Sequence, residues 1–200
     1  GVQALARTAL LPDVLPPVAR LSAEALTRTA EAVGAVPAAL VCRLAALLWL
    51  TDDDGQACEA LRFSKATSRA VQHLLALRAL QPDPDAPAAA IRAAVARVGR
   101  QAWPDYLAIQ RAWAGAGAAR WDALAARVAG LDALSGPLTV KELAIDGRAV
   151  AQVLQIRPSR RIGRLLQALL EAVWAEPSLN TPDALRARLP DVDAALEDGP

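Results

Sequence analysis

The sequence predicts an all-α protein, folded as an irregular helical bundle in two subdomains that we name the body and the tail. Ala and Leu dominate the 200 residues, and both are among the strongest helix formers. Apolar side chains recur at steps of three and four residues, which is the period of a helix that buries one face. Prolines and glycines separate these periodic stretches, and 54% hydrophobic content is enough to build a core.

The body is expected to open with two helices. Ser22 is placed to cap a helix that ends at Val33, with Gly34 just beyond it. Pro37 suits the first turn of the next helix, whose apolar residues continue at helical spacing to Thr51. Because this second helix is so apolar, we expect it at the centre of the core.

An acidic run follows, and Asp52, Asp53 and Asp54 are expected to start a short helix that ends near Phe63. Carboxylates accept hydrogen bonds from the free N–H groups of a helix start. Asp52 and Asp54 also have the D-x-D spacing that can hold Mg²⁺ in phosphoryl transfer. That chemistry needs a rigid strand and a glycine-rich phosphate loop nearby, and the sequence has neither, so helix capping is the preferred interpretation.

Ser64 is expected to cap a longer helix that reaches Leu80. Arg62, Lys65 and Arg69 lie around the start of this helix, where they are placed to form a basic edge that contacts phosphates. An ordinary solvated face is the alternative interpretation of the same spacing.

A proline-rich break at residues 81–87 precedes helices expected at 88–98, 104–114 and 118–134. Glycines on both sides of the last of these helices mark a junction between subdomains. We therefore divide the chain into a body of residues 1–114, a connecting segment of residues 115–138 and a tail of residues 139–200.

The tail is expected to contain three helices. Asp146 is placed to cap the first, which ends near Leu154, and residues 160–175 form a strongly periodic second helix. The third begins at Thr181. The acidic end, residues 191–200, is expected to fray.

The strongest candidate site is the turn and helix start at residues 156–164. This segment carries Arg157, Arg160, Arg161 and Arg164, although the net charge of the chain is only +1. A helix start offers free N–H groups and a partial positive charge, so it attracts anions and disfavours guanidinium groups. An anionic ligand therefore accounts for the cluster. The alternative is a solvated helix end whose Arg stems cover apolar neighbours.

Other chemistry finds little support in the sequence. His73 is the only histidine, which excludes a site built on several histidines. Cys42 and Cys58 lack CxxC spacing and are interpreted as buried thiols, and no nucleophile has a recognisable base partner. The five tryptophans can stack bases but occupy apolar helical positions, so we expect them to pack internally. No metal site and no cofactor is expected in this chain.

A specific motif occurs in the tail, in the segment GRAVAQVLQIRPSRRIGRLLQALLEAVWAEPSLNTPDAL. It resembles the C-terminal region of bacterial CCA-adding tRNA nucleotidyltransferases and poly(A) polymerases, whose pattern is G-x-x-L-x-x-x-[LI]-x-P-G-P-x-[IL]-G-x-[IL]-L, followed by N-T-x-x-x-L. Residues 43–50, 60–75 and 91–112 look like the helical body of the same family. The matching positions in the tail are Gly147, Val150, Leu154, Ile156, Pro158, Ile162, Gly163, Leu165, Leu166, Asn180 and Leu185.

Two departures from the family pattern bear on function. The family's P-G-P is Pro158, Ser159 and Arg160 here, which adds a hydroxyl and a charge at the proposed anion site. Where some relatives carry the His-Asp pair of a metal phosphohydrolase, this chain has Trp49 and Leu50, so that activity is not expected.

The resemblance implies that this chain is not itself an enzyme. A catalytic head would precede residue 1 and use Mg²⁺ with ATP or CTP, while the helices bind tRNA or another structured RNA by its backbone and shape. The absence of Met fits an excised piece of such a protein. No signal peptide and no apolar run of about 18 residues is evident, so we expect a cytoplasmic protein. A helical interaction or dimerisation module, present as a homodimer, is the alternative.

Overall fold

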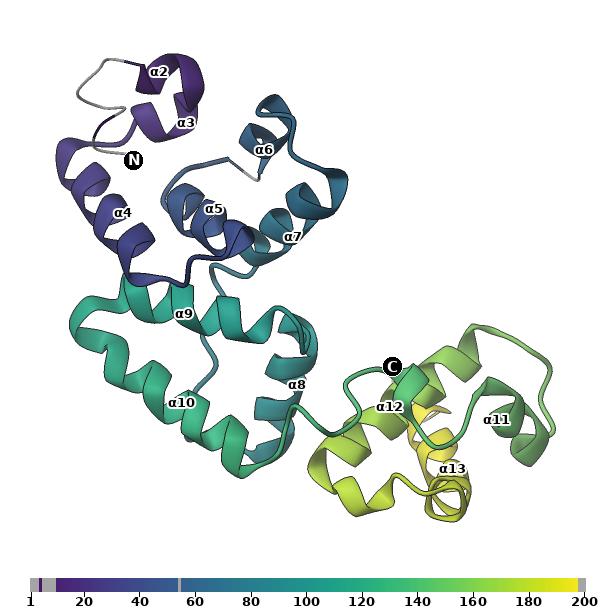
Figure 1. Cartoon of the computed structure of the whole chain (residues 1–200). Helices are drawn as coiled ribbons and strands as arrows, with labels where there is room; N and C mark the ends of the chain where they lie inside the picture. The colour runs from purple at the N-terminus through teal and green to yellow at the C-terminus, as the bar shows by residue number, and fades with distance from the viewer. Residues whose placement is uncertain (1–3, 5–9, 54, 198–200) are drawn as a thin grey trace. The chain divides into compact units, whose positions relative to one another are not determined.

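The computed structural model describes Ala4, residues 10–53 and residues 55–197. This part of the chain is helical and contains no strand, which confirms the predicted all-α class. The chain forms two compact units (Figure 1). Unit 1 comprises residues 1–81 and 101–125, and unit 2 comprises residues 82–100 and 126–200.

Unit 1 is built around a central apolar helix, α5, as the sequence predicts. Helix α5 packs against α4, α7 and α9, and Figure 1 shows it between α4 and α7. Cys42, Ala45, Ala46 and Leu48 of α5 are each at most 1% exposed. The helices of unit 1 are α2 (Leu11–Val14), α3 (Pro16–Ala19), α4 (Ala23–Ala35), α5 (Leu40–Leu48), α6 (Gln56–Ala60), α7 (Lys65–Ala76), α9 (Trp103–Ala114) and the first part of α10 (Ala118–Gly130).

The predicted serine caps are confirmed, but several helix ends differ from the expectation. The Ser22 hydroxyl accepts a hydrogen bond from the N–H of Ala25 at 3.2 Å, and Ser64 accepts one from Thr67 at 3.1 Å. Helix α4 includes Gly34 and ends where Val36 adopts an extended conformation. A residue before proline avoids the helical conformation, and Val36 is also held in the core. Helix α5 therefore begins only at Leu40, beyond the turn.

Unit 2 is built around α12, which packs against α8, α11 and α13. Leu165, Leu169 and Val173 on the buried face of α12 are each at most 1% exposed. Of the end that is expected to fray, residues 191–197 are helical, and Val192 and Leu196 pack against the core. Residues 198–200 lie outside the described residues. The elements of unit 2 are α8 (Ala88–Val98), the end of α10, the 3₁₀ turn η2 (Val140–Glu142), α11 (Gly147–Leu154), α12 (Arg160–Ala175), the 3₁₀ turn η3 (Pro177–Leu179) and α13 (Pro182–Glu197).

The two units do not coincide with the predicted body, connecting segment and tail. Helix α8 was assigned to the body, yet it packs against α12 in unit 2. Arg92 of α8 donates hydrogen bonds to the carbonyl oxygens of Trp174, at 2.7 Å, and Leu131, at 3.2 Å. The predicted connecting segment is divided between the units after Ala125. An amphipathic pattern shows that a helix buries one face, but it does not identify the helix on which that face packs.

Candidate nucleic-acid interface

The turn that leads into α12 leaves the start of this helix without a side-chain cap. Helix α11 ends at Leu154, and the C-cap residue Gln155 has a left-handed conformation with φ 55°. Ser159 precedes α12 in extended conformation, but its hydroxyl accepts no hydrogen bond from the helix start. The first turn of α12 also contains no acidic residue. The positive end of the helix dipole therefore has no negative group from its own first turn beside it.

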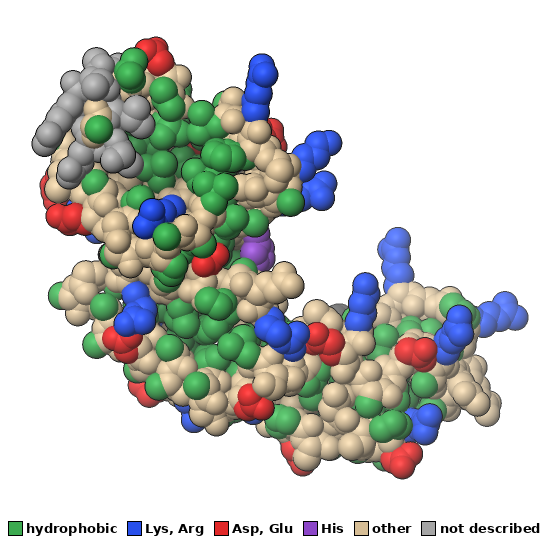
Figure 2. Space-filling view, viewed as in Figure 1, with side chains coloured by type: hydrophobic (Ala, Val, Ile, Leu, Met, Phe, Trp, Pro, Cys, Tyr) green, Lys and Arg blue, Asp and Glu red, His purple; other side chains and the backbone are tan. Residues whose placement is uncertain are grey.

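Three of the four predicted arginines are exposed around this helix start. They are Arg157, Arg160 and Arg164, and within the described chain none of them forms an ion pair. Arg160 and Arg164 are four residues apart on one helix, so they lie on the same face. Figure 2 shows Lys and Arg side chains standing out from the surface over α11 and the start of α12. We refer to these three residues as the tail arginines.

Arg161 has a different environment from the tail arginines. Its Nη2 lies 2.6 Å from Oδ1 of Asp193 on α13, and its Nε donates a hydrogen bond to the same oxygen at 2.8 Å. The side chains of Arg161 and Asp193 are only 32% and 19% exposed. Arg161 therefore joins α12 to α13 and is already partly neutralised, in contrast to its role as one of four equal phosphate ligands in the sequence prediction.

The second predicted group, Arg62, Lys65 and Arg69, is exposed in unit 1 around the start of α7. Arg62 has a positive φ of 59° in the turn between α6 and α7. Lys65 and Arg69 are one helical turn apart and share a face. Unlike α12, helix α7 is capped by its own serine, so its free N–H groups are partly satisfied. Because the two groups lie in different units, each is treated as a separate surface.

Within the acidic run before α6, Asp53 caps the start of the helix, as the sequence predicts for the run. Oδ1 of Asp53 accepts a hydrogen bond from the N–H of Gly55, and Oδ2 accepts one from Ala57 at 3.1 Å. Asp54, the other half of the D-x-D pattern, lies outside the described residues. Among the residues that are described, no group of three or more His, Cys, Asp or Glu side chains is arranged to hold a metal ion.

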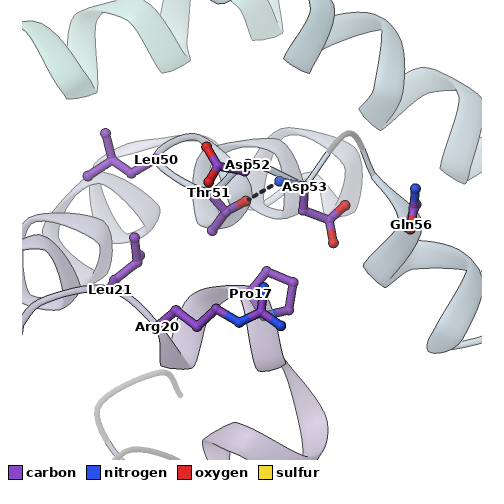
Figure 3. A pocket seen from close by; sticks show the side chains of 8 residues that line it. All are labelled: Pro17, Arg20, Leu21, Leu50, Thr51, Asp52, Asp53 and Gln56. Atoms are coloured by element: carbon purple, nitrogen blue, oxygen red, sulfur yellow. Dashed lines mark hydrogen bonds between the residues drawn. The ribbon is translucent and has the colours of Figure 1, made fainter.

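A pocket of about 390 Å³ lies beside this run, and Figure 3 shows the side chains that line it. Arg20, at the end of α3, extends along the side of the pocket opposite Thr51 and Asp53. The Thr51 hydroxyl donates to the carbonyl of Leu48 at 2.8 Å and accepts from the N–H of Asp53 at 3.3 Å. The polar groups of this pocket thus support the turn between α5 and α6.

The cysteines and tryptophans occupy packing positions. Cys42 and Cys58 are buried free thiols, as predicted, and burial raises the pKa of Cys42 to about 12 and also raises the pKa of Cys58. Trp49, Trp103 and Trp121 are at most 8% exposed. The remaining two tryptophans are half-buried. Stacking of bases on the three buried rings would require the core to open.

Arg148 is a basic residue that the sequence analysis did not select. It lies in the first turn of α11, and it lines a groove together with Pro158 and Ser159 at the start of α12. From the sequence, the cap residue Asp146 predicts where α11 starts and therefore places Arg148 in its first turn. Only the packing of α11 against α12 shows that the two helix starts line the same groove.

Comparison of the chain with protein-family models, with curated proteins and with solved structures finds no match. Within the described residues, none of the helices combines the length and the apolar character needed to cross a membrane. The case for a function therefore depends on the residues and geometry described above.

Proposed function

We propose that this chain binds structured RNA, in the first place tRNA, through the phosphate backbone. In this proposal it is the body and tail of a tRNA nucleotidyltransferase or poly(A) polymerase and positions the RNA 3′ end for a catalytic head outside the chain. The observation that carries the proposal is the set of three exposed tail arginines at the uncapped start of α12.

The electrostatics of this helix start favour an anionic ligand. A helix dipole places about half a positive charge at the N-terminus, and a cation near it is unfavourable by about 0.3–1 kcal/mol. Arg160 lies in the first turn of α12, and no acidic residue there compensates it. A bound phosphate would neutralise the guanidinium groups and accept hydrogen bonds from the free N–H groups of the helix start.

Phosphate groups of RNA suit the number and type of these side chains. Arginine presents a planar fork of donors that matches the oxygens of a phosphate, and it keeps its charge at all physiological pH values. Several arginines on a short segment suit several neighbouring phosphates better than a single small anion. Arg62, Lys65 and Arg69 supply a second set of phosphate contacts in unit 1 under the same proposal.

The individual residues have distinct roles in this proposal. The tail arginines contact phosphates, whereas Arg161 is a positioning residue that holds the start of α12 against α13 through Asp193. The chain binds RNA but does not catalyse nucleotide addition, so it needs no cofactor of its own. Mg²⁺ and ATP or CTP would be bound by the head, and the protein would act in the cytoplasm, where tRNA is matured.

Binding of tRNA by the chain over a series of salt concentrations tests this function. Counterion release predicts that log affinity falls linearly with log salt, with a slope of roughly 0.7 to 0.9 per phosphate contact. The triple variant R157E/R160E/R164E is expected to lose at least about tenfold in affinity and to show a shallower slope.

A matched control distinguishes RNA binding at a specific site from general attraction of RNA to a positively charged protein. Arg97, Arg127 and Arg188 are exposed arginines on other helices of unit 2, and R97E/R127E/R188E changes the net charge by the same amount. Equal losses in the two triple variants would mean that the tail arginines form no specific site. Self-association that is insensitive to salt, with no RNA binding, would instead favour the interaction module.

A further inference from the structure

A groove of about 550 Å³ lies between the starts of α11 and α12 in unit 2. This volume is within the range of small-molecule binding sites, which is about 300–1,000 Å³. The apolar part of the lining comes from Ala151, Pro158, Ile162 and Leu166. The polar part comes from Asp146, Arg148 and Ser159, and the two glycines Gly147 and Gly163 complete it.

Gly163 lines this groove without filling it, and no contact with the described residues requires a glycine there. A Cβ atom built on Gly163 meets no heavy atom within 4 Å, so a larger residue would fit the fold. Its backbone is helical, in the interior of α12, where glycine is less favourable than alanine by roughly 1 kcal/mol. Gly147 differs, because a Cβ atom there would lie 3.1 Å from Cγ2 of Ile162. A side chain at Gly147 would press on Ile162, whereas a side chain at Gly163 would enter the space of the groove.

A carboxylate at one edge of the groove is available to a ligand. Oδ1 of Asp146 accepts hydrogen bonds from the N–H groups of Arg148, at 3.0 Å, and Ala149, at 2.9 Å. These bonds, that of Ala149 foremost, lower the pKa of Asp146, so its side chain is charged at neutral pH. The side chain of Asp146 is exposed, so its carboxylate is accessible to an amino group of a ligand.

One arginine, Arg148, lines the groove itself. Arg160 and Arg164 do not line it, but each is the next residue in the chain after a lining residue, Ser159 and Gly163 respectively. The groove therefore combines apolar walls, a carboxylate and adjacent guanidinium groups, which are the features that recognise the base, the exocyclic amine and the phosphates of a nucleotide, respectively.

We propose that this groove takes the base of one unpaired nucleotide of the bound RNA that carries an exocyclic amine (adenosine, cytidine or guanosine), while its flanking phosphates lie on Arg160 and Arg164. The inference rests on the proposed function, because it assumes that the tail arginines hold an RNA backbone. It adds base recognition to a contact that would otherwise be independent of sequence. Adenine, cytosine and guanine carry an exocyclic amine that can donate a hydrogen bond to the carboxylate of Asp146, whereas uracil has none.

Short oligonucleotides test the groove directly on the whole chain. A fluorescent hexamer of adenosine is compared with a hexamer of abasic nucleotides and with a hexamer of uridine, all three having the same number of phosphates. We expect the adenosine hexamer to bind about tenfold more tightly than the abasic hexamer, since a hydrogen bond to a charged group and the burial of a base face together contribute at least that factor. The affinity for the uridine hexamer is expected to lie between the affinities for the adenosine and abasic hexamers.

A bulky side chain at Gly163 tests the position of the base. In G163L the leucine fills the groove and is also a better helix former than glycine, so the fold is kept. We expect the variant to bind the adenosine hexamer only as well as wild type binds the abasic one, with unchanged affinity for the abasic hexamer. G34L is the matched control, because Gly34 is likewise an exposed helical glycine with no heavy atom within 4 Å of its Cβ position, but it lies in unit 1.

The outcomes separate this inference from the function on which it rests. Equal binding of adenosine and abasic hexamers would overturn base recognition while leaving phosphate binding intact. Full adenosine affinity in G163L would overturn the assignment of the groove. Absence of binding to all three hexamers and to tRNA would overturn both proposals.

Discussion

Arg161 of α12 and Asp193 of α13 form an ion pair of 2.6 Å, and this pair separates Arg161 from the three exposed arginines that surround it in the sequence. Charge reversal of one of these exposed arginines is therefore expected to have a different consequence from the loss of the Arg161–Asp193 pair. The first affects an exposed side chain, and the second breaks a contact between two helices of unit 2.

Substitution of Asp193 is expected to reduce stability but not RNA binding. In D193N the half-buried Arg161 loses the charge of Asp193, which costs about 1–2 kcal/mol of unfolding free energy. D191N is the control, because Asp191 is an exposed residue of the same helix and its replacement should change stability by less than about 0.5 kcal/mol. Urea denaturation measures both values. A D193N protein that is as stable as wild type would show that the pair does not hold α12 against α13.

The stability of unit 2 should decrease at acidic pH in part because of Glu142. Hydrogen bonds from the N–H of Leu138, followed by contributions from Arg100 and the N–H of Thr139, outweigh a burial effect and lower the pKa of Glu142 below its ordinary value of 4.5. A lowered folded-state pKa stabilises the fold above the unfolded value. That contribution is lost as pH falls through the folded pKa.

The variant E142Q isolates this contribution. Because the carboxylate and Arg100 are 36% and 44% exposed, solvent screens the pair, and we expect a loss of about 1 kcal/mol at pH 7 that becomes smaller at pH 3. Denaturation of wild type and E142Q at both pH values measures it. E171Q, on the exposed face of α12, is the control, and a loss for E142Q that is the same at both pH values would contradict the assignment.

Alanine at the two glycines of the groove should have opposite effects on stability. G163A is expected to stabilise the protein by about 0.5–1 kcal/mol, because its methyl group enters open space and alanine favours the helix. G147A is expected to destabilise it by about 1 kcal/mol, because its methyl group would lie 3.1 Å from the side chain of Ile162. Thermal unfolding compares the two, and a stabilising G147A would show that Ile162 moves freely.

Both cysteines should be unreactive in the folded protein. Burial raises the pKa of the Cys42 thiol to about 12, and it raises the pKa of Cys58 as well, so very little thiolate forms at pH 8. A thiol reagent such as DTNB is expected to modify neither residue before unfolding and both in denaturant. Rapid modification under native conditions would mean that α5 and α6 open readily.

Local signals in the sequence predicted the secondary structure well where a cap and a periodic apolar face agree. The bounds of α8, α11 and α12 coincide with the predicted ones, and Ser22, Ser64 and Asp146 cap their helices as expected. These features depend on residues within one or two turns of each other. The predicted ends of α4, α5, α7, α10 and α13 were less accurate. At the turn between α4 and α5, Val36 is extended and buried in the core.

The candidate site includes features that local sequence signals do not predict. The sequence by itself determined the all-α class, the helix starts and the gathering of basic residues at the start of α12, because each of these depends on neighbours along the chain. Only the tertiary structure decided that α8 belongs with α12, that Arg161 pairs with Asp193 across 32 residues, and that Gly163 borders a groove. The physical reason is that amphipathic spacing specifies how much of a helix is buried but not which partner buries it.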